Sequence, residues 1–443
     1  MDRREFLKKA GVGAAALGVG ACAPGSLKGG SDNKETTSPS GTMVCNYEGV
    51  GLLGYGCMRW PQVKGDDGKN HIDQDAVNSL VDYALEHGVN YFDTSPIYLE
   101  GDSERATAEA LNRHPREKWL LATKLSNFGD ASYDNSVKMY RKSLEIFKTD
   151  YVDYYLLHSV SGGADFNNRF GDTGIMDFLL EERRKGHIRN LGFSFHGPDN
   201  GFRELMSLHE KYHWDFVQIQ MNYMDWTHSG ANNASAKFLY GELDSREIPI
   251  IIMEPLRGGR LADLPAALAD MLKSREPQKS LASWAFRFAG SFPRVKCILS
   301  GMTYMNHLQD NLDTFLDFKP LTDEEKDLLE LTADQMEKYP LVRCTSCQYC
   351  MPCPYGINIP AIFRFYNDNV NAGTYVVNKE QEGYAKARRR YLLAYDKAIP
   401  SVRQADHCIS CGRCSRACPQ HIAIPRELRR IDAYIESLKR EEL

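Results

Sequence analysis

The sequence has neither a long apolar run nor a strong excess of charge of either sign. No apolar stretch reaches the ~18–20 residues that a membrane-spanning helix needs, which excludes a polytopic membrane protein. Lys and Arg number 54 against 59 Asp and Glu, for a net charge of −5, so nothing indicates a nucleic acid partner. Hydrophobic residues make up 42% of the chain and charged residues 26%, which excludes a wholly disordered protein.

Cysteine is unevenly distributed along the chain. The 443 residues include 12 cysteines, and eight of these fall in the last 100 residues, in two tight runs. A length of this order predicts two or three domains, at roughly 100–200 residues each. The C-terminal runs therefore indicate a separate, cysteine-based domain behind a larger one.

The N-terminal residues have the features of an export signal. Residues 1–22 combine a charged start containing Arg3-Arg4 with a short, weakly apolar stretch, and resemble a twin-arginine (Tat) export signal. Cys22 ends a lipobox-like sequence, which predicts a lipid anchor to the membrane. Residues 23–42 are rich in Gly, Ser, Thr and Pro and read as a flexible linker. We expect an exported protein, periplasmic or a membrane-anchored lipoprotein; a plain cleavage site and a cytoplasmic protein with a basic terminus are the alternatives.

Residues 43–330 alternate short β-rich runs with amphipathic helical stretches. Eight such units over ~250 residues predict an α/β fold of the (β/α)8 TIM-barrel type. A doubly wound open sheet is the competitor, but no Gly-x-Gly-x-x-Gly follows the first strand. The predicted strands are Gly51–Cys57, Val89–Asp93, Trp119–Lys124, Tyr151–His158, Ile188–Phe195, Phe216–Met221, Ile248–Met253 and Val295–Ser300.

Polar residues follow three neighbouring predicted strands. Asp93 and Tyr98 follow the second strand, Lys124 ends the third and His158 ends the fourth. A Tyr donates a proton readily only if its pKa falls well below ~10, and a nearby Lys ammonium favours that change. The Asp carboxylate would hold the Lys charged, and the His would orient a carbonyl. The set predicts general acid catalysis of hydride addition to C=O.

These residues resemble the aldo-keto reductase family over roughly residues 45–318. Asp93-x4-Tyr98, Lys124 and His158 match the family's tetrad in type and order, and Gly101-x-Ser103-Glu104 also fits. The resemblance implies that Tyr98 is the acid/base, that Lys124 and Asp93 tune it, and that His158 positions the carbonyl of a small-molecule carbonyl or alcohol substrate.

The resemblance also implies a nicotinamide cofactor, NAD(P). Met253 stands where the family generally has an aromatic residue, and Gly301 and His307 stand where basic residues would hold a 2′-phosphate, so NAD and NADP both remain open. His196 replaces an expected Asn and reads as a rim residue. The expected cofactor contacts are Ser194, Gln218, Met253, Gly301 and Asn311.

Residues 335–443 carry the two cysteine runs. The first is Cys344-x2-Cys347-x2-Cys350-x2-Cys353-Pro and the second is Cys408-x2-Cys411-x2-Cys414-x3-Cys418-Pro. Zinc sites favour two pairs separated by a longer gap, and disulfides rarely use four Cys at successive x2 spacing, so both are weaker alternatives. The second run matches bacterial ferredoxins, in which the fourth Cys serves the other cluster.

The ferredoxin resemblance implies a small, α-rich domain with two [4Fe-4S] clusters. One cluster would be held by Cys344, Cys347, Cys350 and Cys418, and the other by Cys408, Cys411, Cys414 and Cys353. Between the runs, Tyr384–Tyr395 reads as a basic helix, with Arg388–Arg390 as a solvated face. Cys45, Cys57 and Cys297 read as packing or surface thiols.

Together the domains predict an oxidoreductase that couples carbonyl chemistry to two clusters and a redox partner protein. Hydride transfer moves two electrons and each cluster moves one, yet the sequence shows no flavin motif. A tightly held nicotinamide that is re-reduced through the clusters is one hypothesis. An exported electron carrier whose barrel only docks a partner is the alternative, and a carbohydrate-processing enzyme is a third.

Overall fold

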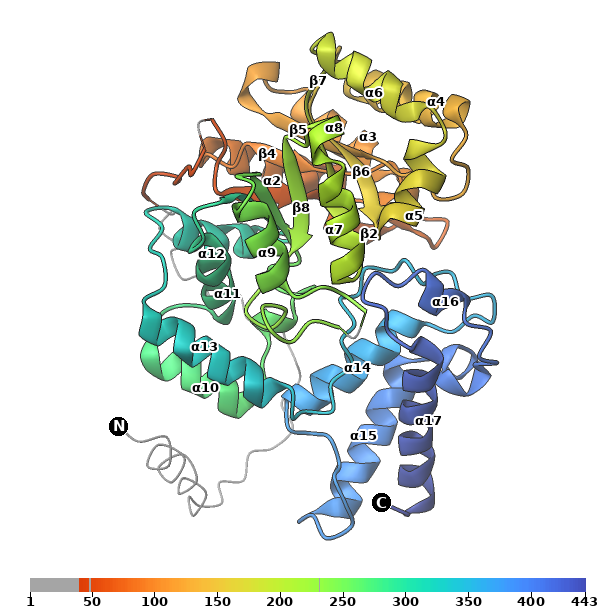
Figure 1. Ribbon diagram of the computed structural model, residues 1–443. Helices are drawn as coiled ribbons and strands as arrows, with labels where there is room; N and C mark the ends of the chain where they lie inside the picture. Colours follow the sequence, from red (N-terminus) through yellow and green to blue (C-terminus); the bar gives the residue numbers. More distant parts are fainter. Residues whose placement is uncertain (1–39, 48, 231) are drawn as a thin grey trace. The chain divides into compact units, whose positions relative to one another are not determined.

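The computed structural model describes residues 40–47, 49–230 and 232–443 (Figure 1). The export signal, Cys22 and nearly all of the predicted linker lie outside the described residues. Pro39–Leu443 form one compact unit. Among the described residues, no helix combines the length and the apolar character needed to cross a bilayer.

Eight parallel strands close into a barrel. Their order around the barrel is β1-β10-β9-β8-β7-β6-β5-β4, so each strand pairs with its neighbour in chain order. This arrangement confirms the (β/α)8 barrel and excludes the open doubly wound sheet. All eight predicted strands are present, with ends shifted by at most two residues. They are β1 (Leu53–Gly56), β4 (Tyr91–Asp93), β5 (Leu120–Leu125), β6 (Val152–Val160), β7 (Ile188–Phe195), β8 (Phe216–Gln220), β9 (Ile250–Met253) and β10 (Val295–Ser300).

Amphipathic helices surround the barrel (Figure 1). In the first of them, the Asp73 side chain accepts a hydrogen bond from the Ala76 amide and caps the N-terminus, while Val77 and Val81 lie on the buried face. Gly88 follows its end with a φ of 83°, which a residue with a Cβ rarely adopts. The helices are α2 (Gln74–Glu86), α3 (Ser103–Leu111), α4 (Tyr133–Phe147), α5 (Gly163–Phe166), α6 (Ile175–Arg184), α7 (Asp199–Ser207), α8 (His209–Tyr212), α9 (Ala236–Asp244), α10 (Ala266–Arg275), α11 (Leu281–Gly290), α12 (Met305–Phe315) and α13 (Asp323–Met336).

A small hairpin between β1 and α2 was not expected from the sequence. Strands β2 (Gln62–Lys64) and β3 (Asn70–Ile72) pair antiparallel around a turn that contains Gly65 and Gly68. The hairpin is mostly exposed and too short to show an apolar alternation, so only its Asp-Gly turn signalled it.

The barrel interior is filled by a layer of apolar side chains that includes Tyr91, Phe216, Ile251 and Cys297. The larger core lies between the strands and the helices. Cys57 and Cys297 are buried and Cys45 is exposed, as expected for packing and surface thiols.

The C-terminal domain has its own core between three helices. They are α14 (Ile359–Asn371), α15 (Tyr384–Ala398) and α17 (Ile424–Arg440), with the one-turn α16 (Arg413–Arg416) between the last two. Phe363, Tyr391 and Ile435 are buried where these helices meet.

The basic helix was correctly predicted, but Arg388 is not part of a solvated face. It donates to the carbonyls of Leu438 and Lys439 and pairs with Glu441 at 3.1 Å. The last carbonyls of a helix have no intrahelical partner, so a cation is drawn to the end of α17. Arg389 and Arg390 are exposed, as predicted.

Candidate functional site

A buried ion pair lies at the carboxyl ends of β4 and β5. These strands pair in parallel, with Asp93 opposite Ala122, which brings Asp93 and Lys124 to the same level of the barrel. The Lys124 Nζ lies 2.6 Å from the Asp93 Oδ1 and donates to the Thr94 carbonyl at 2.7 Å. The two residues are 1% and 3% exposed. Burial raises the pKa of Asp93, and the Lys124 ammonium acts against that rise.

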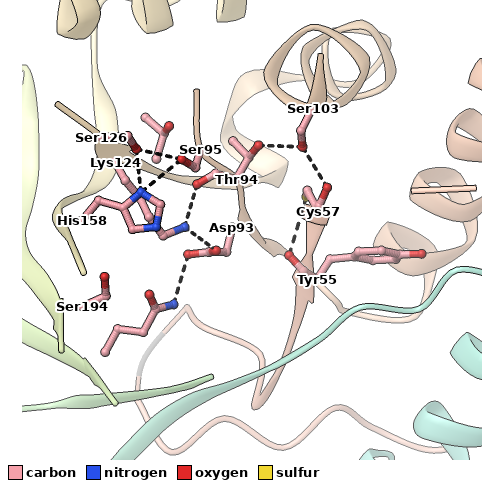
Figure 2. A network of polar contacts seen from close by, with 12 residues as sticks. Tyr55, Cys57, Asp93, Thr94, Ser95, Ser103, Lys124, Ser126, His158 and Ser194 are labelled. Carbon is pink, nitrogen blue, oxygen red and sulfur yellow. Dashed lines mark hydrogen bonds and ion pairs between the residues drawn. The ribbon is translucent and has the colours of Figure 1, made fainter. Parts of the chain in front are cut away.

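His158 lies near the carboxyl end of β6, and its imidazole contacts two serine hydroxyls (Figure 2). Its Nδ1 lies 2.6 Å from the Ser126 Oγ and 3.3 Å from the Ser95 Oγ, and the two hydroxyls lie 2.8 Å apart. Burial, followed by the Lys124 charge, holds the pKa of His158 well below 6.5, so the imidazole is neutral at pH 7. In the tautomer in which Ser126 donates to Nδ1, the proton resides on Nε2 and faces the barrel mouth.

Tyr98 follows β4 in a strained turn. Leu99, Glu100 and Gly101 have φ angles of 52°, 58° and 95°, all in the left-handed region. This turn places the Tyr98 ring 4.7 Å from the Lys124 Nζ and 5.8 Å from the His158 ring, edge-on. The four tetrad residues are therefore brought together.

The pKa of Tyr98 shifts opposite to the expected direction. Burial raises it well above its usual value, and the Asp93 charge raises it further. A hydrogen bond from Tyr349 lowers it, but by less. Tyr98 is therefore a protonated phenol at neutral pH rather than a phenol close to ionisation.

Ser103 and Glu104, at the start of α3, make hydrogen bonds to residues next to the tetrad. The Ser103 hydroxyl donates to the Cys57 carbonyl at 2.8 Å and lies 2.9 Å from the Thr94 Oγ1 (Figure 2). The Glu104 carboxylate accepts from the Thr123 hydroxyl at 2.6 Å. These contacts tie α3 to the strands that carry the tetrad.

The side chains expected to contact nicotinamide are mostly engaged within the protein. Gln218 donates to the Asp93 Oδ2 at 3.2 Å, the Ser194 Oγ accepts from the Ser159 amide at 2.7 Å, and Asn311 donates to the Ser300 Oγ at 3.0 Å. All three of these predicted contacts are buried. Each keeps a further donor or acceptor, the amide oxygens of Gln218 and Asn311 and the hydroxyl hydrogen of Ser194, so their contact with a nicotinamide stays a prediction.

The remaining expected cofactor positions lie nearer the surface. Met253 is half-buried at the end of β9, and Gly301 is exposed after β10. The ideal Cβ position of Gly301 lies 3.0 Å from the Arg59 side chain, so that loop is also in close contact. His196 lies after β7 at the rim, and burial lowers its pKa to about 4.

The cysteines form two groups. Four of the sulfur-bearing residues line one cavity: Cys344, Cys347, Cys350 and Cys418. The described cysteines are all free thiols, which removes the disulfide alternative for them. No three Cys, His, Asp or Glu side chains in the described ranges converge closely enough to hold a single metal ion. Four cysteines around one cavity are the donor set that a [4Fe-4S] cluster uses.

The second group is less complete. Cys408 and Cys411 are close enough to Cys414 that their charges raise its pKa, after the larger effect of burial. Cys353 is half-buried against the core of the C-terminal domain. Its place beside the other three stays a prediction.

The first cysteine run lies across the barrel mouth. Arg59 donates to the Thr345 carbonyl at 2.6 Å, and the Tyr349 hydroxyl lies 3.3 Å from the His158 Nε2. Gln220 and Gln420 exchange amide hydrogen bonds of 2.7 and 3.2 Å. The C-terminal domain therefore covers the end of the barrel where the tetrad lies.

Sequence reasoning missed Ser95, Ser126 and Tyr349. Ser95 lies two residues after β4 and Ser126 directly follows β5, at the edge where polar residues were already singled out, so their position was a usable signal. Tyr349 had no such signal, because a position between two cysteines does not predict a contact with the barrel.

The chain matches two family models. Residues 52–332 match the aldo/keto reductase family, and residues 343–424 match the 4Fe-4S dicluster domain. The chain spans 49% of the length of a probable aldo-keto reductase of Glycine max, with 27% identity over 186 residues, or 40% of this chain. With L-galactose dehydrogenase of Arabidopsis thaliana it is 23% identical over 303 residues, covering 64% of this chain and 90% of that one.

The fold also resembles solved structures. A thermostable aldo-keto reductase in complex with the inhibitor epalrestat superimposes with a TM-score of 0.52 at 20% identity, covering 65% of this chain and 98% of that one. At this identity the likeness concerns the fold alone. With the family model spanning most of the barrel, the chain belongs to the aldo/keto reductase family of oxidoreductases and carries a 4Fe-4S dicluster domain after its barrel.

Proposed function

We propose that this protein transfers a hydride between a nicotinamide and a carbonyl or alcohol substrate, with Tyr98 exchanging the proton, and exchanges the electrons with a redox partner through two [4Fe-4S] clusters. The observation that carries this proposal is the buried Lys124–Asp93 pair directly beside Tyr98 and a neutral His158. A buried ion pair costs desolvation free energy, so its presence at a barrel's catalytic end favours a functional role.

The proton steps follow from the protonation states. Tyr98 is protonated and is the group that donates to a carbonyl oxygen during reduction, or accepts from the alcohol in reverse. The neutral His158 offers its Nε2 proton to the same oxygen as a hydrogen bond. Lys124 carries the positive charge that stabilises Tyr98 while its proton is away.

The clusters supply one-electron chemistry when bound. We assign one [4Fe-4S] cluster to Cys344, Cys347, Cys350 and Cys418, because these residues line one cavity. We assign the other to Cys408, Cys411, Cys414 and Cys353. A carbonyl/alcohol couple exchanges a hydride at carbon and a proton at oxygen: a nicotinamide would carry the hydride, Tyr98 the proton, and two clusters that each change by one electron would exchange the two electrons of that nicotinamide with the partner.

Nicotinamide dependence stays a prediction. Ser194, Gln218 and Asn311 each make one internal hydrogen bond and keep a further donor or acceptor for the cofactor. The measurement is to analyse the purified protein for bound dinucleotide, then add NADH or NADPH anaerobically and follow the visible absorbance of the clusters. Bleaching by either would show that a nicotinamide and the clusters share one electron path. A protein that carries no dinucleotide and binds none would overturn the proposed reaction.

The substrate class is proposed to be sugar-like, because one relative is named L-galactose dehydrogenase. We would screen L-galactose, other aldoses and small aldehydes with the holoprotein, using a one-electron dye as acceptor or donor. Tyr98→Phe removes the proton donor and should lower kcat by roughly 10²–10⁴-fold. Equal activity in the Tyr98→Phe variant would favour the alternative, an electron carrier whose barrel serves as a docking scaffold. Activity restricted to non-redox sugar chemistry would favour the third reading, a carbohydrate-processing enzyme.

Export and lipidation are also proposals. They rest on Arg3-Arg4 and Cys22 in the sequence. Fractionation of the full chain against a variant with both arginines changed to Lys tests export, and Cys22→Ala tests the anchor. Unchanged location in both variants would contradict them.

A further inference from the structure

One side chain of the cluster-binding segment reaches the catalytic residues of the barrel. The Tyr349 hydroxyl lies 3.3 Å from the His158 Nε2, and the Tyr98 ring lies 5.8 Å from the same imidazole, so Tyr349 is close enough to Tyr98 to lower its pKa. Tyr98 and His158 are the two groups that the proposed function assigns to the oxygen of the carbonyl substrate. The Tyr349 oxygen therefore occupies the position that this substrate oxygen would take.

The segment that carries Tyr349 is fixed between the two domains. On one side, the Ser346 amide donates a hydrogen bond to the Cys344 sulfur at 3.3 Å, and Ser346 and Gln348 turn the chain with φ angles of 53° and 68°. On the other side, Arg59 holds the Thr345 carbonyl. The side chain is thus aimed into the barrel mouth by the loop that surrounds the cysteine-lined cavity.

The loop after β9 leaves room for this segment only because Gly258 has no side chain. An ideal Cβ on Gly258 would lie 2.1 Å from the Thr345 carbonyl oxygen, far inside contact distance. The neighbouring Gly259 has a φ of 98°, comparable to the 71° of Gly258, but its Cβ would meet nothing within 4 Å. The two glycines share the same conformational demand and differ only in this contact.

We propose that Tyr349 is a substrate-site residue that the iron–sulfur domain contributes to the barrel, and that its hydroxyl holds the place of the substrate oxygen until substrate displaces it. This inference rests on the proposed function for the roles of Tyr98 and His158. It goes beyond that function by making the cluster-binding segment a lid of the carbonyl site.

Two variants test the lid without removing a tetrad residue. Tyr349→Phe keeps the ring but removes the competing hydroxyl, and Gly258→Ala pushes Thr345 and its segment away from the mouth. Their matched controls are Tyr355→Phe, which changes an exposed tyrosine of the same domain, and Gly259→Ala. Cluster absorbance and circular dichroism of each holoprotein check that the domains remain intact.

The first readout does not need turnover. Diethyl pyrocarbonate modifies neutral imidazole nitrogen, and peptide mass spectrometry reports the rate at His158 in each holoprotein. We expect slow modification in the wild type and both controls, and a rate raised by roughly 3- to 10-fold or more in Tyr349→Phe and Gly258→Ala, on the scale of one lost hydrogen bond. Rapid modification of His158 in the wild type, or equal His158 modification rates in Gly258→Ala and Gly259→Ala, would contradict the proposal that this segment covers the site.

The second readout separates substrate binding from chemistry, using the sugar or aldehyde that the screen identifies. Loss of the competing hydroxyl should lower KM by roughly 3- to 10-fold while kcat is kept, because one hydrogen bond no longer has to be displaced. A lower kcat at unchanged KM would instead make Tyr349 a partner in the chemistry and refute the place-holding role. If no variant turns over any substrate, the proposed function fails, while the His158 modification rates still decide whether Tyr349 covers the site.

Discussion

At the scale of single residues, the buried pair of Lys124 and Asp93 is the part of the site where a substitution should cost the most stability. Both are almost fully buried, and the Lys124 ammonium has two acceptors, the Asp93 carboxylate and the Thr94 carbonyl. Asp93 in turn accepts from Gln218. Removing either charge leaves the other buried without a counterion, which is far more costly than the loss of a surface pair.

Lys124→Met should therefore destabilise the barrel by about 3–5 kcal/mol. The control is Lys142→Met, which breaks the exposed pair with Glu145 and should cost at most ~0.5 kcal/mol. Urea unfolding of the two variants and the wild type measures the difference. Equal losses would mean that water reaches the tetrad.

The loss in Lys124→Met should also depend on pH. Burial already raises the pKa of Asp93 above 3.8, and without Lys124 nothing comparable opposes that rise. A carboxyl whose pKa is raised in the folded state holds its proton longer there than in the unfolded chain. The free energy of unfolding of the variant should thus fall as the pH rises from 3.8 through the raised pKa, and the gap to the wild type should widen between acidic and neutral pH. If the difference in free energy of unfolding between the wild type and the variant narrows as the pH rises, Asp93 is not buried in the folded variant.

At the scale of elements, the contact between α15 and the end of α17 is a feature that cysteine spacing does not require. Arg388 donates to carbonyls at the C-terminal end of α17 and also pairs with Glu441. The adjacent Arg389 is exposed. The two arginines are neighbours on one helix, so they differ mainly in what they contact.

Arg388→Ala should lower the stability of the C-terminal domain by about 1–2 kcal/mol, because it removes bonds to helix-end carbonyls and a favourable charge. Arg389→Ala should change it by no more than ~0.5 kcal/mol. Thermal unfolding of the holoproteins, followed by loss of cluster absorbance, compares them. If both variants behave alike, Arg388 is solvated as the sequence suggested.

At the scale of the whole molecule, the barrel and the C-terminal domain have separate cores but share the barrel mouth. The barrel core is continuous from β1 to α13, whereas the C-terminal core is smaller and surrounds the cysteine-lined cavity. Small domains with metal sites commonly depend on the metal for folding, because binding free energy is folding free energy.

Oxidative removal of the clusters should therefore loosen the C-terminal domain and leave the barrel folded. Hydrogen exchange should show faster exchange in α14 and α17, and unchanged protection in β5, β6 and β7. Loss of protection throughout the barrel strands would show that the two cores fold as one unit.

Much of the architecture was readable from the sequence because its signals are local. Strand runs such as Val295–Ser300 reflect apolar, β-rich residues within one element, and the x2 spacing of the cysteines lies within one loop. The order Asp93, Tyr98, Lys124 and His158 identified the tetrad, because parallel barrel strands bring their carboxyl ends together. The hairpin β2–β3 was not predicted, because it is short and exposed and shows no apolar alternation.

The sequence by itself thus determined the (β/α)8 barrel, the tetrad and the cysteine-rich domain. Only the tertiary structure decided what surrounds them. The direction of the Tyr98 pKa depends on burial and on Asp93, the engagement of Gln218 depends on its distance from Asp93, and the arrival of Tyr349 at His158 depends on how one domain packs on the other. The physical reason is that periodicity and spacing act along the chain, whereas desolvation and close contact act through space.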